Sequence, residues 1–598
     1  MINKNADTLA IDIETYDPNL EKLGPGVYRN DGYILGVSIS DGVNSEYYSL
    51  RHYDTLEKER QKNKEIIKEI LALDNIKIGA NLMYDVDWLE NWGGIKVNGK
   101  LYDIQIAEAL IDENQGHYSL DYISKKYLGV GKTSALPEKF CIENNLKGDF
   151  RAHLYRMPYI LVKDYAIGDV EEPIKIMTIQ KKILEKEELF ELFELECNLI
   201  RCLILMRKTG TKIDTNKRDR NAFKVQCDIE TREQALFSQE GEFNYNSSPQ
   251  VALIFDKYGI PYETTKKGNP SIDANYLKLI REEHKIADDI FELRKAKKHL
   301  DTFLMGSYVR YVGENNLIHC SFYNTRTDEF GTRSGRFSSA NPNLQQIPSK
   351  GVDEYWGQVC REVFIPFEDC WWGKIDYSQI EYRFMAHFAI GEGSAEIRNA
   401  YNNNPDQDYH QYIMDLTGLK RRYAKNLNFG VAFGMGAQHM ADLFQWTIDY
   451  AYEVLDIYHS KAPYIKSTIK EVEKVATKRG YIKTFLKRRS HLLDKRKAYT
   501  MYCRLVQGSA ADLMKKAMSV NYNSGVYDIL YPHLTVHDEL DVSIPKTKIG
   551  IEAYKEMKHQ METCLILKVP IKAEAEVGDN WADISEEKAK EIMEYYPL

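Results

Sequence analysis

This 598-residue sequence lacks the features that mark membrane, secreted or zinc-binding proteins. Its nine cysteines form no Cys-x-x-Cys pair, which argues against a zinc module or a disulfide framework. No run is apolar enough to span a membrane, and the opening MINKNADTLAIDIET contains no apolar signal region. We therefore expect a cytoplasmic protein without a membrane partner.

The sequence also lacks a net positive charge, because 89 acidic residues outnumber 80 Lys and Arg and the formal net charge is −9 at pH 7. This does not exclude a nucleic-acid partner, since phosphate is bound by local basic patches rather than by net charge. Three basic clusters are present, at Arg294–Lys298, Lys420–Lys425 and Lys487–Lys497. Each alone is more typical of a solvated helix face, so it indicates DNA binding only where it flanks a catalytic site.

The length of the chain predicts about three to five domains or subdomains. The first part, residues 1–185, alternates short β-branched runs with helical patterns, which is typical of an α/β unit. From Lys186 to Phe303 the sequence is charged and helical, and we expect long, partly solvent-bridging helices there. Helical patterns dominate again until Gly480, and strand signals return at Leu534–Ile544.

Two acidic residues, Asp12 and Glu14, lie two positions apart in the strand-like run LAIDIETY. The two-residue period of a strand puts both carboxylates on one face and the apolar Leu9, Ile11 and Ile13 on the other. Like charges placed side by side are costly unless a cation lies between them. A lone Asp-x-Glu is more often an exposed strand edge, so this pair needs support from other residues.

That support comes from two later motifs. Asp85 follows the apolar strand at 76–78, and Tyr165 and Asp169 lie one turn apart in a helical pattern. Four carboxylates and a tyrosine can hold two divalent cations and orient a water for phosphodiester hydrolysis. In this order the motifs resemble those of the DEDDy 3′→5′ proofreading exonucleases, as does the segment His117–Gly129. The resemblance implies that Tyr165 positions the attacking water and that four carboxylates bind the metals: Asp12, Glu14, Asp85 and Asp169.

A second set of acids lies far downstream. The segment WWGKIDYSQIEYRFMAHF is typical of an apolar strand that ends at Asp376 and continues into a helix. The segment LTVHDELDVSI is typical of two strand halves around His537, Asp538 and Glu539, which exposes two acids at a hairpin tip. Each segment alone is explained equally well as an ordinary strand or turn that carries acidic residues.

Between these acids, the segment KRRYAKNLNFGVAFGMG repeats at a spacing of four. Arg421, Lys425, Phe429 and Phe433 therefore share one broad face of a helix. This face runs from cationic to aromatic over roughly 18 Å, the same polarity as a nucleoside triphosphate with its phosphates and stacking base. An amphipathic core helix with a basic end is the alternative, and only the flanking acids count against it.

Together these three segments resemble motifs A, B and C of family A DNA polymerases, the bacterial DNA polymerase I family. Four further segments resemble that family: Ser247–Pro261, Thr332–Pro348, Gln507–Met518 and Val577–Trp581. The resemblance implies a mixed α/β chain in which an RNase H-like exonuclease domain precedes a right-hand polymerase. The implied order is exonuclease domain 1–185, thumb 186–305, first part of the palm 306–395, fingers 396–480 and second part of the palm 481–598.

The same resemblance implies a role for each matched residue. Asp376 and Asp538 hold two Mg²⁺ ions, for which Mn²⁺ can substitute, and Glu539 supports them. The implied dNTP-binding set is Arg421, Lys425, Phe429, Phe433, His410 and Glu381. Within it Lys425 also protonates the leaving pyrophosphate, and Glu381 with Phe429 excludes a ribose 2′-OH. The implied primer–template set is Arg336, Gln507 and His537.

Three residues depart from the family pattern. Phe433 stands where tyrosine is common, which removes a hydroxyl near the templating base. Lys487 stands where glycine is common and adds a candidate phosphate contact. Cys503 stands where asparagine is frequent.

The aromatic at Phe429 gives a prediction about chain terminators. Phe429 matches the relatives that discriminate against dideoxynucleotides, so we expect poor dideoxynucleotide incorporation. A primer-extension assay with equimolar dideoxynucleotide and dNTP measures this, and efficient chain termination contradicts it.

Three other functions are weaker explanations of the sequence. A single-subunit RNA polymerase predicts a small residue in place of Glu381 and no proofreading domain, and a translesion enzyme predicts a degraded exonuclease. A non-catalytic DNA-binding scaffold predicts at least one missing metal ligand. The proofreading motif starts at Asp12 and Phe243–Ile280 has no large insertion, so we expect a self-contained phage replicative enzyme. Its expected partners are primer–template DNA, dNTPs and replisome proteins such as a helicase or single-strand binding protein, with the chain itself a monomer.

Overall fold

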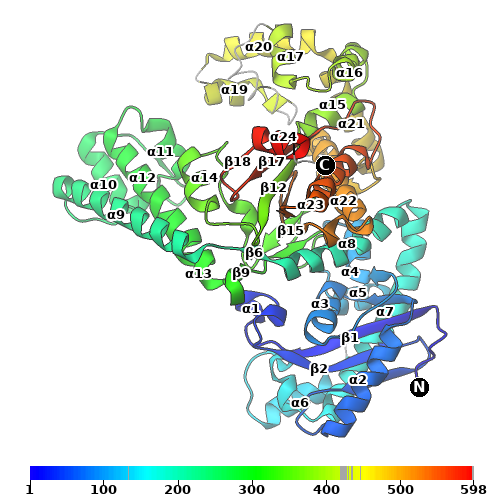
Figure 1. The fold of residues 1–598 in the computed structure, drawn as a ribbon. Helices are drawn as coiled ribbons and strands as arrows, with labels where there is room; N and C mark the ends of the chain where they lie inside the picture. The colour runs from blue at the N-terminus through cyan, green and yellow to red at the C-terminus, as the bar shows by residue number, and fades with distance from the viewer. Residues whose placement is uncertain (132–133, 418–426, 428–429, 432–434, 445, 596–598) are drawn as a thin grey trace.

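The N-terminal part is a five-stranded sheet in the order β3-β2-β1-β4-β5, seen at the bottom of Figure 1. The computed structural model describes residues 1–131, 134–417, 427, 430–431, 435–444 and 446–595. The strands are β1 Thr8–Tyr16, β2 Tyr33–Ser40, β3 Ser45–Ser49, β4 Ile76–Gly79 and β5 Leu101–Asp103. The helices are α1 Leu20–Leu23, α2 Glu57–Leu71, α3 Leu82–Asp87, α4 Ile104–Ile111, α5 Leu120–Leu128, α6 Ala135–Glu143 and α7 Tyr159–Lys186.

Strand β1 lies at the centre of this sheet, antiparallel to β2 and parallel to β4. Its apolar residues Leu9, Ile11 and Ile13 are buried, as their alternation with the acids predicts. Helix α7 packs across β1, β2, β3 and β4. The carboxylates of β1 and α7 are therefore carried by elements that contact each other directly.

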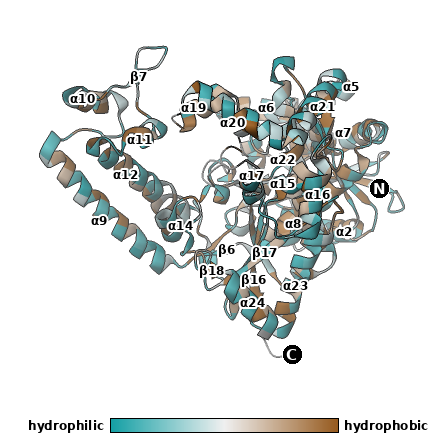
Figure 2. Cartoon of the chain, turned by 90° about the horizontal axis from the view of Figure 1, so that it is seen from above, coloured by the Kyte–Doolittle hydropathy of each residue, from teal (hydrophilic) through white to brown (hydrophobic). Residues whose placement is uncertain are grey.

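A helical arm follows, drawn in green at the left of Figure 1. It consists of α9 Thr215–Glu240, α10 Ser248–Tyr258, α11 Ala274–Ile280, α12 Lys285–His299 and α13 Tyr308–Arg310. The long helix α9 buries Ala222, Val225, Ile229 and Leu236, a single stripe at helical spacing, and packs against α12. The rest of its surface is mostly hydrophilic (Figure 2), which confirms the expected solvated helices.

Helix α8 (Phe190–Thr209) corrects the expectation that this whole region bridges solvent. It packs against both α22 (Met501–Asn523) and β15 (Tyr531–Val536), far downstream in the sequence. Its apolar residues lie around most of its circumference, and a helix of that kind is buried rather than amphipathic. Among the described residues no helix is both long and apolar enough to cross a membrane.

The second large sheet has the order β15-β16-β12-β17-β18 and is antiparallel throughout. Its other strands are β12 Cys370–Tyr377, β16 Glu539–Pro545, β17 Ala573–Gly578 and β18 Ile584–Ser585. The helices around it are α14 Glu354–Arg361, α15 Ile380–Phe388, α23 Lys548–Thr563 and α24 Glu586–Tyr595. Above it in Figure 1 lie α16 Ser394–Asn403, α17 Tyr409–Thr417, α19 Ala437–Phe444, α20 Ile448–Lys461 and α21 Pro463–Arg479. The short strands are β6 Thr211–Lys212, β7 Glu263–Thr264, β8 Pro270–Ser271, β9 Leu317–Ile318, β10 Ser321–Tyr323, β11 Ser338–Ala340, β13 Tyr481–Lys483 and β14 Arg489–His491.

A buried network of charged side chains joins α8 to the second sheet's helices. Glu196 of α8 accepts a hydrogen bond from Lys515 of α22 (2.6 Å) and pairs with Arg488, which follows β13. Arg488 also donates to Asp512 of α22 (2.7 Å), and Asn324 donates to Glu196 (2.7 Å). Two acids and two bases compensate one another, which buried charges require.

Candidate active sites

The first acidic cluster lies where β1 meets α7. One oxygen each from Asp12, Glu14 and Asp169 can be chosen so that all three lie within 4.8 Å of one another. Glu14 and Asp169 are buried, and Asp12 is half-buried. Three carboxylates at this separation repel one another. Carboxylate oxygens are ligands that suit hard divalent cations such as Mg²⁺ or Mn²⁺. The donors therefore fit the predicted metal site.

Asp85 of α3 lies beside this cluster. Its Oδ1 accepts the N–H of Ile13, the residue between the two β1 acids (2.9 Å). Burial raises the pKa of Asp85 to about 8, with Asp103 and Asp169 adding to the rise and the Ile13 hydrogen bond opposing it. Asp103 in turn accepts the N–H of Leu82 (2.7 Å) and so fixes the start of α3. Asp85 is therefore positioned beside the cluster by its hydrogen bond to β1 and by the fixed start of α3.

Tyr165 is buried one helical turn before Asp169. Burial and the negative charges of Glu14, Asp169 and Asp12 raise its pKa above the ordinary value, so its hydroxyl stays protonated at neutral pH. Phe150 packs edge-on against the Tyr165 ring at 5.3 Å.

Sequence reasoning missed Arg151, which follows Phe150 in a short 3₁₀ segment. Arg151 pairs with Asp149 (2.5 Å), and its positive charge opposes the rise in the pKa of Tyr165. It belongs to no recognisable motif, so the sequence carries no signal for it.

The second acidic cluster lies on the antiparallel sheet. Asp376 is near the end of β12, and the next residue, Tyr377, donates its N–H to the carbonyl of Asp538 (3.1 Å). Both acids line a cavity of about 760 Å³. Burial and Glu539 raise the pKa of Asp376 to about 7, and Lys374 opposes that rise. Burial also raises the pKa of Asp538, opposed by Arg336.

The hairpin tip differs from the predicted one, because the exposed residue is His537, whereas Asp538 is half-buried and Glu539 is buried. The turn consists of His537 and Asp538 alone, so Glu539 begins β16 and pairs in register with Asp376. Glu539 is buried, 3.6 Å from the ammonium of Lys374 and 3.5 Å from the guanidinium of Arg361. The expectation of two exposed acids is therefore wrong, since a two-residue turn leaves no room for a third residue at the tip.

A second cavity, of about 330 Å³, shares Asp538 with the first. It is also lined by Arg336, Glu381 and His537. Arg336 donates a hydrogen bond to Glu381, and burial raises the pKa of Glu381 to about 7 against the opposing charge of Arg336. Three of the predicted DNA- and nucleotide-contacting residues thus surround one opening next to Asp538.

A further predicted residue, His410, contacts the lining of this cavity, and Gln507 lies one helical turn after a residue near it. His410, in α17, packs edge-on against Tyr382 (5.0 Å), the residue after Glu381. Gln507 lies in α22, half-buried, and Cys503 one turn earlier is close enough to Glu381 and Arg336 for their charges to act on its pKa. The remaining predicted dNTP-binding residues, Arg421, Lys425, Phe429 and Phe433, lie outside the described residues.

Lys487 has a backbone conformation that accounts for the glycine common at its position. Its φ is 70°, in the left-handed region that glycine adopts without strain. Its side chain is exposed. The proposed phosphate contact of Lys487 stays a prediction.

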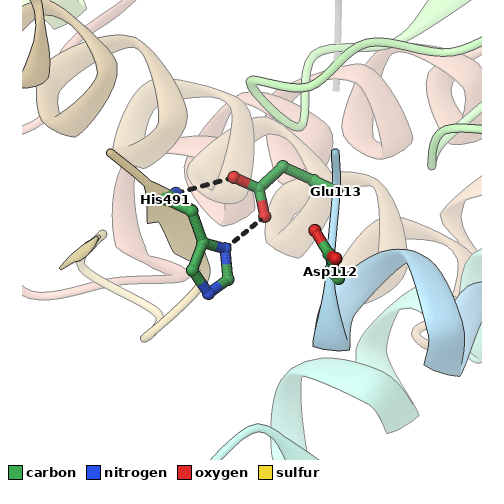
Figure 3. Close-up of side chains that lie close together, drawn as sticks. All are labelled: Asp112, Glu113 and His491. Atoms are coloured by element: carbon green, nitrogen blue, oxygen red, sulfur yellow. Dashed lines mark hydrogen bonds and ion pairs between the residues drawn. The ribbon is translucent and has the colours of Figure 1, made fainter. Parts of the chain in front are cut away.

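A third group of ligand-type side chains joins the two halves of the chain (Figure 3). Asp112, Glu113 and His491 can each place one donor atom within 4.8 Å of the others. Glu113, just after α4, accepts hydrogen bonds from the N–H (2.7 Å) and from Nδ1 (2.8 Å) of His491 in β14. Because both carboxylate oxygens of Glu113 are used in this way, we interpret the group as an interdomain contact rather than a metal site.

This interdomain contact predicts that the stability of the protein depends on pH. The hydrogen bond that His491 donates to Glu113 raises the pKa of His491 above its ordinary value, and burial only partly opposes it. A raised histidine pKa means that its contribution to stability is complete below about pH 6.5 and is lost as pH rises through the folded-state pKa. We expect His491→Gln to lower the free energy of unfolding by about 1 kcal/mol at pH 6 and by less at pH 8.5.

Denaturant unfolding at both pH values measures the effect. His117→Gln is the matched control, because His117 is 3.8 Å from Asp328 but its side chain is 70% exposed, and we expect no such pH dependence. If His491→Gln lowers the free energy of unfolding equally at both pH values, the interdomain contact does not depend on a charged His491.

Comparison with known proteins places this geometry in a family. The family described as DNA polymerase family A matches residues 216–583, and the family described as 3′-5′ exonuclease matches residues 2–185. A DNA-directed DNA polymerase of Pseudomonas phage M6 is 31% identical, over 97% of this chain and 94% of its own length. DNA polymerase DpoZ of Salmonella phage PMBT28 is 27% identical, over 97% of each chain.

A solved structure agrees with the fold. The POL domain of Pol1 from M. smegmatis, solved with DNA primer-template and dNTP, superposes with a TM-score of 0.79 at 21% identity and covers 97% of this chain and 96% of its own. Two acidic clusters, on a mixed sheet and on an antiparallel sheet, accompany the two matched families. The chain therefore belongs to the family A DNA polymerases and is a DNA-directed DNA polymerase with a 3′-5′ exonuclease domain.

Proposed function

We propose that the chain copies a primer–template from dNTPs and removes mispaired 3′ ends, with two divalent ions, Mg²⁺ or Mn²⁺, at each site. The observation that carries this proposal is the presence of two separate acidic clusters, one on β1 and α7 and the other at the end of β12. Two ions 3.5–4 Å apart stabilise both the attacking and the leaving oxygen in phosphoryl transfer.

In the polymerase site, Asp376 and Asp538 are proposed to hold the ions. Burial, and at Asp376 the neighbouring Glu539, raise the pKa of these two acids, and a bound cation would favour their charged forms. The proposed phosphate contacts are Arg421, Lys425 and His410, and Lys425 protonates pyrophosphate. Phe433 lies near the templating base, and Glu381 together with Phe429 excludes a nucleotide that carries a ribose 2′-OH. Arg336, Gln507 and His537 hold the primer–template, and Glu539 supports the site.

In the exonuclease site, Tyr165 is proposed to orient the attacking water. Its raised pKa supports this role, because a protonated hydroxyl can donate a hydrogen bond and still accept one. The ions there are held by the four predicted carboxylates: Asp12, Glu14, Asp85 and Asp169.

The domain order proposed for the chain is exonuclease, thumb, palm, fingers, palm. The packing of α8 on α22 and β15 favours counting that helix with the palm rather than with the thumb. The two phage relatives, which the chain matches nearly end to end, support a replicative role in a phage and hence in the host cytoplasm. Helicase or single-strand binding protein is the kind of partner that such a role requires.

Primer extension tests the proposal. Purified protein is incubated with a 5′-labelled primer on a longer template and Mg²⁺, with and without the four dNTPs. We expect extension with dNTPs and 3′ shortening without them. Absence of both activities over a range of salt and metal concentrations contradicts the proposal.

A further inference from the structure

The ammonium of Lys374 lies among three carboxylates on the floor of the polymerase cavity. Its Nζ is 3.7 Å from Asp376, 3.6 Å from Glu539 and 3.3 Å from Glu576. Lys374 precedes Asp376 by two residues in β12, and strand periodicity puts both side chains on one face. Its side chain is only 14% exposed, so this is an internal ion group rather than a surface pair.

The acids around the cavity are compensated unequally. Glu539 has a second cation, because Arg361 lies 3.5 Å away and is itself fixed over the Trp581 ring at 4.0 Å. Asp376 keeps a side chain that is 41% exposed to the cavity, whereas Glu539 is buried beneath it. Glu539 therefore lies beside two cations of the protein, Lys374 and Arg361, whereas Asp376 lies beside Lys374 and still faces the cavity.

Charge explains why this matters for a divalent cation. Glu539 lies opposite Asp376 on β16, and Glu576 lies opposite Lys374 on β17. Both are as good oxygen donors as Asp376 and Asp538. Without a resident positive charge, they compete for any ion that enters and add to the repulsion that spreads the carboxylates apart. A lysine in contact with Asp376 and with both neighbouring glutamates suppresses both effects.

We propose that Lys374 is a positioning residue that keeps Glu539 and Glu576 out of metal coordination, so that Asp376 and Asp538 alone hold the ions. The inference rests on the proposed two-metal function of the palm. Lys374 acts through the carboxylates and touches neither substrate nor the reacting atoms.

Two variants separate charge from shape. Lys374→Met keeps the length of the side chain and removes its charge, and Lys374→Arg keeps the charge. Each is made in the full chain and again with Asp12→Ala and Asp169→Ala, which removes two of the four exonuclease acids and so weakens metal binding at that site. Free Mn²⁺ is counted by electron paramagnetic resonance at pH 8, and primer extension is measured in parallel.

We expect Lys374→Met to bind Mn²⁺ about fivefold more tightly, because the site gains one net negative charge. Its kcat for extension falls about tenfold or more while KM for dNTP changes little, and Lys374→Arg stays near the parent in both measurements. Adding Glu539→Gln to Lys374→Met returns Mn²⁺ affinity toward that of the parent.

Unchanged or weaker Mn²⁺ binding by Lys374→Met overturns the inference. Circular dichroism and thermal unfolding of the full-length Lys374→Met variant show whether it is folded, because exonuclease activity reports only on the other domain. If the variant is unfolded, Lys374→Arg with Glu539→Gln decides instead. Mn²⁺ affinity near that of Lys374→Arg supports the inference, whereas a large loss overturns it, because Glu539 would then be a metal ligand despite the neighbouring cation. If the parent protein does not extend a primer, the proposed function is wrong. If the parent extends the primer and Lys374→Met behaves like the parent, only this inference is wrong.

Discussion

Asp538→Ala is expected to reduce primer extension by at least about a thousandfold while 3′ shortening continues at the parent rate. Asp538 lines both cavities of the palm, between Asp376 on one side and the Arg336–Glu381 pair on the other. Removing its carboxylate takes one of the two proposed metal-binding groups and leaves Arg336 without that neighbouring charge. A loss of this size follows because positioning and charge stabilisation supply nearly all of the catalysis in phosphoryl transfer.

Two further variants make this result specific. Asp538→Asn preserves the size of the side chain and should be nearly as inactive, because an amide is a much weaker metal ligand than a carboxylate. Asp528→Ala removes an exposed acid ten residues earlier and should leave extension unchanged. Extension by Asp538→Ala within about tenfold of the parent would falsify the assignment of this carboxylate.

Asp12→Ala is expected to have the reverse effect, with 3′ shortening reduced by about a thousandfold and extension of a matched primer unchanged. Asp12 is the most accessible of the three acids whose oxygens gather within 4.8 Å. Its loss leaves Glu14 and Asp169 without the third donor of that group. The polymerase acids lie on a different sheet, so they are not affected.

A mispaired primer makes the measurement more sensitive. The parent should shorten the mispaired end before extending it, whereas Asp12→Ala should extend it directly or stall. Asp7→Ala, which removes an exposed acid just before β1, is the control for damage to the strand. If Asp12→Ala also loses extension of a matched primer, the two sites do not act independently.

Local spacing was enough to predict which side chains share one face of an element, whereas the roles of the acids came from the resemblance to known families. The alternation of LAIDIETY gave one face of β1, and the four-residue step from Tyr165 to Asp169 gave one face of α7. Both patterns depend only on the geometry of a single strand or helix. The α/β character of residues 1–185 followed in the same way, from runs of strand and helix signals, whereas the architecture of the whole chain came from the resemblance.

Contacts between distant segments could not be predicted. Glu113 and His491 are 378 positions apart, and Glu196 and Lys515 are 319 apart, so no periodicity connects them. Glu539 was predicted to be exposed because the register of its hairpin depends on which two residues form the turn. Strand periodicity puts Lys374 on the same face as Asp376, but its contacts with Glu539 and Glu576 depend on the pairing of β12 with β16 and β17.

The buried position of α8 limits where the chain can be cut. A fragment that starts with the helical arm at Thr215 omits Glu196 and leaves Lys515 and Arg488 in the interior with only Asp512 as counter-charge. Loss of one partner from a buried ion group costs about 3–5 kcal/mol, a large part of the stability of a domain. A polymerase-only expression fragment should therefore begin before Phe190, upstream of the whole of α8.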